Sequence, residues 1–119
     1  MCSTDKLQSI VIEAIEDKKG QKITVIDLTE ISSASASAFV ICQGRTNTQV
    51  SSIADNIIDE VNRRLDLKPY HTDGFRNSQW VIIDYGDLVV HVFQPETREF
   101  YNLEELWSDG VTTDIPDPE

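Results

Sequence analysis

The stretch "WVIIDYGDLVVHVF", residues 80–93, contains two aspartates three positions apart, Asp84 and Asp87, on either side of a tyrosine–glycine pair. Carboxylates held this close repel each other, and a divalent cation would relieve the repulsion, as in metal-dependent nucleotidyl transfer. The same residues also suit the ends of a tight turn, because aspartate side chains hydrogen-bond nearby backbone amides. The spacing by itself leaves both interpretations open.

Metal-dependent phosphoryl chemistry needs more than two carboxylates. A third acid, a phosphate-holding loop and nearby cations are its usual further parts. The loop "CQGRTNTQ", residues 42–49, has one glycine and one arginine, so it is not a glycine-rich phosphate cradle. A lone D-x-x-D pair more often stabilises a turn than takes part in catalysis. We therefore predict no catalytic residue, no metal and no cofactor; the alternative is a divergent magnesium-dependent nucleotidyltransferase that uses Asp84 and Asp87.

The histidines and cysteines show no pattern typical of a reactive site. His71 and His91 have no serine or cysteine partner in a nucleophile motif. Cys2 and Cys42 lie far apart and form neither a C-x-x-C pair nor a zinc pattern. We expect both thiols to be free, as in a reducing compartment.

The elements that position these residues follow from the spacing of apolar side chains. Residues 5–19 and 46–65 have the apolar stripe of an amphipathic helix, and Thr46 and Gln49 have capping-box spacing. Strands are expected at residues 22–28, 38–43, 68–74, 80–84 and 88–93. Helical turns are expected after Pro95 and around residues 102–107. This order predicts an α/β fold in which helices flank a mixed sheet.

We predict that residues 80–93 form a β-hairpin with Tyr85 and Gly86 as its two turn residues, so that Trp80 opposes His91. Side-chain alternation then separates an aliphatic face, which must be buried, from a second face. This second face, called the mixed face below, holds Trp80, Ile82, Asp84, Asp87, Val89 and His91. An aromatic anchor beside aliphatic residues and acids is typical of an interaction patch. Coverage by a helix is the alternative, and a bulge would shift the register by one residue.

Length and charge narrow the class of protein. The 119 residues fit one domain, predicted at 1–107, and the acidic, proline-containing tail at 108–119 is expected to be disordered. The net charge of −11 disfavours direct nucleic-acid binding and suits a basic partner. No apolar run is long enough to span a bilayer. The N-terminus lacks the features of a signal or transit peptide, so we expect a cytoplasmic protein.

Three segments together resemble one protein family: "WVIIDYGDLVVHVF", "REFYNLEELW" at residues 98–107 and "FVICQGRTNTQVSSIAD" at residues 39–55. They resemble the ribosomal silencing factors, also called Iojap-like proteins, and the resemblance covers residues 5–107. It implies a fold similar to nucleotidyltransferases without a working catalytic site. It also implies a translation repressor that binds the large ribosomal subunit through its fourteenth protein. Such a factor sterically blocks joining of the small subunit when nutrients are short.

Carried onto the matching positions, the resemblance implies a partner-binding site on the hairpin. Its expected residues are Trp80, Asp84, Tyr85, Asp87 and His91. Trp80 and Tyr85 would be apolar anchors, Asp84 and Asp87 would pair with Lys or Arg, and His91 would be a support. The chain departs from the family pattern outside the hairpin, with serine at position 37 and glutamine at position 49. Self-association as a homodimer through the mixed face or an edge strand stays open.

Overall fold

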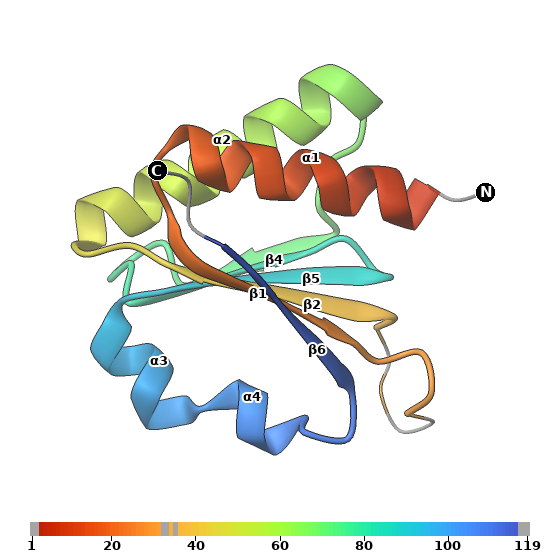
Figure 1. Cartoon of the computed structure of the whole chain (residues 1–119). Helices are drawn as coiled ribbons and strands as arrows, with labels where there is room; N and C mark the ends of the chain where they lie inside the picture. The colour runs from red at the N-terminus through yellow and green to blue at the C-terminus, as the bar shows by residue number, and fades with distance from the viewer. Residues whose placement is uncertain (1–2, 32–33, 35, 117–119) are drawn as a thin grey trace.

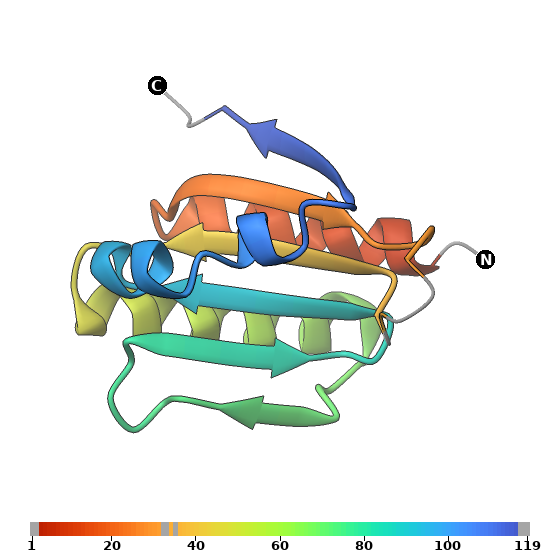
Figure 2. The same ribbon diagram turned by 90° about the horizontal axis from the view of Figure 1, so that it is seen from below.

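A six-stranded mixed sheet forms the middle layer of the computed structural model, which describes residues 3–31, 34 and 36–116. In chain order the elements are α1 (Ser3–Asp17), β1 (Gln21–Asp27), β2 (Ala38–Gln43), α2 (Asn47–Leu65), β3 (His71–Asp73), β4 (Trp80–Asp84), β5 (Leu88–Phe93), α3 (Pro95–Tyr101), α4 (Leu103–Leu106) and β6 (Val111–Ile115). The strand order is β3-β4-β5-β2-β1-β6, and only the β2–β5 pair is parallel among these described strands. Helices α1 and α2 cover one face of the sheet, and α3 and α4 lie on the other (Figures 1 and 2). The predicted α/β fold is confirmed.

Helix α2 begins where the sequence predicts a cap. The Thr46 side chain accepts a hydrogen bond from the backbone N–H of Gln49 at 3.0 Å. The Gln49 side chain accepts from the backbone N–H of Arg45 and donates to the carbonyls of Lys18 and Lys19. The cap is therefore confirmed, but the return bond of a capping box goes one residue further back. Gln49 also ties the start of α2 to the end of α1.

The β4–β5 hairpin has a longer turn than predicted. Asp84 is the register partner of Val89, and Trp80 is the partner of Phe93, so the two-residue turn at Tyr85 and Gly86 is wrong. The Tyr85 N–H donates to the carbonyl of Leu88 at 2.9 Å, and three residues, Tyr85, Gly86 and Asp87, connect the two strands. The register differs from the prediction by two residues. Since side chains alternate with a period of two, each strand residue keeps its predicted face.

The two faces of the hairpin pack against different helices. The aliphatic face is fully buried in the larger core cluster, together with the apolar stripes of α1 and α2. On the mixed face His91 and Phe93 are buried, while Trp80, Ile82 and Val89 are half-buried. Phe93 belongs to a smaller cluster that includes Leu103 of α4. Coverage by helices therefore holds for one part of the mixed face, and the rest stays open.

The expectation of a disordered tail is wrong for Val111–Ile115, which pairs with β1 in antiparallel register as strand β6. Thr24 also donates a side-chain hydrogen bond to Asp114 at 2.9 Å. The run of valine, threonines and isoleucine favours a strand. Pairing with β1 satisfies the backbone N–H and C=O groups of this segment, and the prediction from acidic composition did not consider this pairing. Residues 117–119 of the predicted tail lie outside the described residues. Within the described part of the chain, each helix is too short or too polar to cross a membrane.

Candidate partner-binding site

Trp80 is the centre of the candidate site and is held on three sides. Its ring stacks on Phe93 of β5 at a centroid distance of 5.0 Å and contacts Tyr101 of α3 at 4.6 Å. Its Nε1 donates a hydrogen bond to Nδ1 of His91 at 3.1 Å. A half-buried tryptophan fixed by two rings and a hydrogen bond presents the remainder of its indole in one orientation.

His91 lies behind Trp80 and is buried among aromatic rings. The rings of Phe39 and His91 meet edge to face with their centroids 4.6 Å apart, and the Nε2 of His91 is buried without a hydrogen-bond partner. Burial lowers the pKa of His91 from 6.5 to about 4, so the imidazole is neutral at pH 7. This geometry suits the predicted role of a support for Trp80.

Asp84 and Asp87 lie at the two ends of the turn, and the Asp84 side chain stabilises the turn by a hydrogen bond. Its Oδ1 accepts a hydrogen bond from the N–H of Gly86 at 2.7 Å. Asp87 is exposed, and its backbone carbonyl accepts from the N–H groups of Ser37 and Ala38 at the start of β2. Among the residues that the structure describes, no group of three or more His, Cys, Asp or Glu side chains could hold a metal ion.

Tyr85 was expected to be an apolar anchor for a partner, but it does not lie on the mixed face. The side chain is buried in the larger core cluster, and its hydroxyl has no hydrogen-bond partner. Burial raises the pKa of Tyr85 to about 12. Tyr85 continues the alternation of Val81 and Ile83, which are buried in the same cluster. The alternation of residues 81, 83 and 85 is visible in the sequence and would have predicted that the Tyr85 ring faces the core.

The other candidate side chains are not part of the site. Cys42 is a buried free thiol, as predicted, and burial raises its pKa to about 12. Cys2 lies outside the described residues. His71 is exposed on β3, where it is the register partner of Asp84.

A surface hollow of about 500 Å³ beside Trp80 was not foreseen from the sequence. Tyr101 and Thr97 of α3 form one wall, and the β3–β4 turn, including Phe75 and Arg76, forms another. The hollow depends on how α3 packs relative to this turn. The apolar periodicity of a single strand does not predict such packing. The adjacent aromatics Phe100 and Tyr101 were the available signal, because neighbouring positions on a short helix cannot both face the core.

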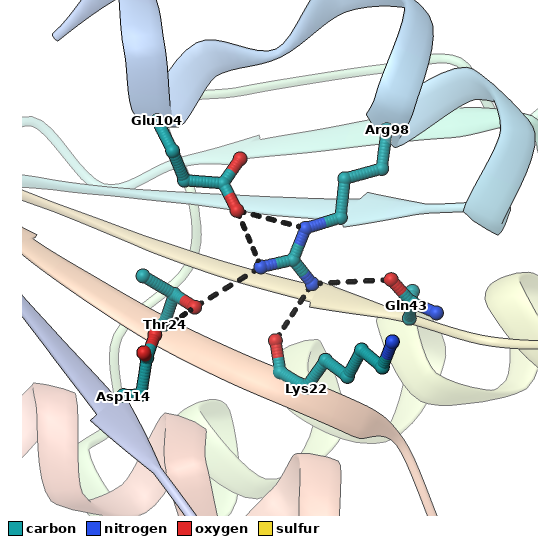
Figure 3. A network of polar contacts seen from close by, with 6 residues as sticks. All are labelled: Lys22, Thr24, Gln43, Arg98, Glu104 and Asp114. Atoms are coloured by element: carbon teal, nitrogen blue, oxygen red, sulfur yellow. Dashed lines mark hydrogen bonds and ion pairs between the residues drawn. The ribbon is translucent and has the colours of Figure 1, made fainter. Parts of the chain in front are cut away.

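Arg98 is a second residue that sequence reasoning missed, and it joins four elements (Figure 3). Its Nε and Nη2 donate to the carboxylate of Glu104 at 3.1 and 2.7 Å. Nη1 donates to the carbonyl of Lys22 at 2.6 Å and to the side chain of Gln43 at 3.3 Å, and Nη2 donates to the hydroxyl of Thr24 at 3.0 Å. The guanidinium thus connects α3 with α4, β1 and β2. A buried arginine with this many acceptors is a structural clamp, not a free anion site.

Comparisons with known proteins bear on the family and the fold of the chain. A family model described as "Ribosomal silencing factor during starvation" matches residues 2–119. The ribosomal silencing factor of Bacillus subtilis is 38% identical over 89% of this chain and 88% of its own length. That of Halalkalibacterium halodurans is 34% identical over 95% of both chains. A crystal structure of a protein from Chromobacterium violaceum superposes with a TM-score of 0.82 at 30% identity, covering 87% of this chain and 85% of that one. The chain therefore belongs to the family of ribosomal silencing factors.

Proposed function

We propose that this protein represses translation when nutrients are short, as a non-enzymatic factor of the cytoplasm. It binds the large ribosomal subunit through that subunit's fourteenth protein and sterically blocks joining of the small subunit. Relatives that carry the name ribosomal silencing factor support the ribosome as the target. The docking face in this proposal is the open part of the mixed face around Trp80.

The single observation that carries the proposal is the fixed orientation of Trp80. Phe93, Tyr101 and His91 hold the indole from three sides, and a hollow of about 500 Å³ adjoins it. A tryptophan that is already ordered loses little conformational entropy on binding, and tryptophans are enriched among residues that dominate interface energies. This arrangement favours Trp80 as the apolar anchor.

Charge supports a protein partner over bare RNA. The chain has a net charge of −11, and Asp87 is exposed at the rim of the mixed face. Acidic surfaces repel phosphate backbones, whereas they attract the basic surfaces that ribosomal proteins usually present. Asp84 and Asp87 are therefore proposed partners for lysine or arginine, with Asp84 also holding the turn through Gly86.

Co-sedimentation with separated ribosomal subunits tests the proposal. We expect the wild type to pellet with the large subunit only, and Trp80→Ala and Asp87→Lys to lose that binding. Asp55→Lys is the matched control, because Asp55 is an exposed acid on α2, across the sheet from the docking face. Binding to neither subunit by the wild type would refute the proposal, and equal losses in Asp55→Lys would show a net-charge effect only.

A joining assay tests the steric part. Small subunits added to large subunits that carry the protein should form fewer assembled ribosomes than small subunits added to free large subunits. Full assembly with the protein still bound would contradict steric blocking. Sedimentation of the protein alone, with and without Trp80→Ala, would reveal a homodimer that competes for the same face.

A further inference from the structure

The helix pair α3–α4 displays large apolar side chains to solvent although it is docked on the sheet. Phe100 is 81% exposed, Leu106 is 71% exposed and Tyr101 is 49% exposed. In the same segment, Leu103 is buried and Trp107 is partly buried against the smaller core cluster. The segment is thus anchored by one set of apolar residues while another set, called the ridge below (Phe100, Tyr101 and Leu106), points outward. Grouped exposed apolar side chains typically mark an interaction surface.

Within residues 94–110, the segment that bears the ridge, the exposed charges are all negative, whereas Arg76 of the β3–β4 turn is an exposed base on the opposite wall of the hollow beside Tyr101. Glu96, Glu99 and Glu105 are exposed, whereas Arg98 is the single base between residues 94 and 110. Arg98 is buried and forms an ion pair with Glu104 at 2.7 Å. The ridge therefore presents apolar groups among carboxylates. Such a surface complements a basic protein surface with apolar groups and repels nucleic-acid phosphates.

Arg98 also fixes the ridge in place. Its guanidinium binds Glu104 of α4 and donates to Thr24 and to the Lys22 carbonyl of β1, so it ties both helices to the sheet (Figure 3). Thr24 in turn donates to Asp114 of β6. A surface that is ordered before binding loses less entropy when a partner docks. Arg98 is therefore a positioning residue for the ridge and does not need to touch the partner.

The aromatic part of the ridge, Tyr101 and Phe100, is continuous with the face around Trp80. The rings of Trp80 and Tyr101 are 4.6 Å apart, and those of Tyr101 and Phe100 meet edge to face at 5.1 Å. An unbroken row of aromatic rings thus leads from the hairpin onto α3. A partner that covers Trp80 would meet Tyr101 and then Phe100 without a gap.

We infer that the ridge is a second part of the docking surface and that it takes a basic protein surface of the large subunit bearing apolar side chains. This inference rests on the proposed function, since it extends the same face. It assigns binding to residues outside the hairpin, and it names the chemistry of the surface that they meet.

Equilibrium binding to purified large subunits tests the inference with Phe100→Ser, Leu106→Ser and Glu99→Lys. We expect each serine variant to weaken binding about tenfold, the scale of an interface hot spot. Glu99→Lys should weaken binding most at low salt, where charge attraction is screened least. Val111→Ser is the matched control, because Val111 is 66% exposed but lies on β6. Thermal unfolding of each variant confirms that the fold is retained.

The outcomes separate the two proposals. If wild-type protein does not bind large subunits, the proposed function itself fails. If the wild type binds and both serine variants bind as tightly as Val111→Ser, the ridge inference is overturned while the function stands. If Phe100→Ser instead abolishes a dimer of the free protein without changing subunit binding, the ridge is a self-association surface and the inference is likewise overturned.

Discussion

The indole Nε1 of Trp80 donates a hydrogen bond to Nδ1 of His91 across the β4–β5 hairpin, with 3.1 Å between the nitrogens. The two residues are not register partners, since Trp80 opposes Phe93 and His91 opposes Ile82, so the bond runs diagonally between the strands. Because Nδ1 is the acceptor, neutral His91 carries its proton on Nε2, which is buried without a partner. The bond therefore links the proposed anchor to a buried base whose charge state can be changed by pH.

His91 should make the protein less stable below pH 6.5. Its folded pKa is lowered to about 4, so between these values the unfolded chain binds a proton that the folded protein does not. Stability therefore falls as the pH falls through this window, with a slope approaching about 1.4 kcal/mol per pH unit. Urea unfolding of the wild type and His91→Gln from pH 7.5 to pH 5 measures the difference. Glutamine still offers Trp80 an acceptor, and parallel curves for the two proteins would contradict the prediction.

Trp80→Phe should isolate the value of the hydrogen bond to His91. Phenylalanine keeps a ring against Phe93 and Tyr101 but leaves the buried Nδ1 of His91 without its donor. We expect a loss of about 1 kcal/mol in the free energy of unfolding, measured by urea denaturation. Trp107→Phe replaces an indole that packs on Phe39 by a smaller ring, and it controls for the loss of buried apolar area. Equal losses in both variants would mean that the hydrogen bond contributes nothing.

Arg98→Lys should destabilise the protein although it conserves charge. A lysine ammonium cannot span Glu104, Thr24 and the Lys22 carbonyl, so buried acceptors lose their donors. We expect a loss of about 2–3 kcal/mol in the free energy of unfolding. Glu104 is partly exposed, so leaving its carboxylate without this donor costs less than it would for a fully buried carboxylate. The same change at Arg63, an exposed partner of Glu60, should leave the unfolding midpoint unchanged. An equal response at both positions would rule out the clamp.

Amide hydrogen exchange should reveal strand β6 in solution. The N–H groups of Val111–Ile115 that point toward β1 should exchange more slowly than those that point to solvent, because only the former are paired. Protection should be weaker than in β2 and β5, which lie inside the sheet, whereas β6 is at its edge. Exchange of all these amides at the rate of an unstructured peptide would restore the disordered tail that composition suggested. Asp114→Ala, which removes the acceptor of Thr24, should lower the protection.

The sequence by itself determined the elements whose signal is local. The bounds of β2, β4 and β5 follow from runs of apolar residues, and the start of α2 follows from a cap within four positions. It also placed Trp80 and His91 on one face, because a register error of two residues leaves each side chain on its predicted face. Tyr85 was misplaced only because its role was taken from the motif and not from the same alternation.

Only the tertiary structure decided which distant groups meet. Arg98 bonds to residues 55 to 76 positions away, and Thr24 reaches Asp114 across 90 positions. The same holds for Tyr101 against Trp80 and for β6 against β1, where pairing overrode an acidic composition. Periodicity reports which side of an element faces the core, and that information is local. Which donor finds which acceptor depends on how whole elements pack, and no pattern within one element contains it.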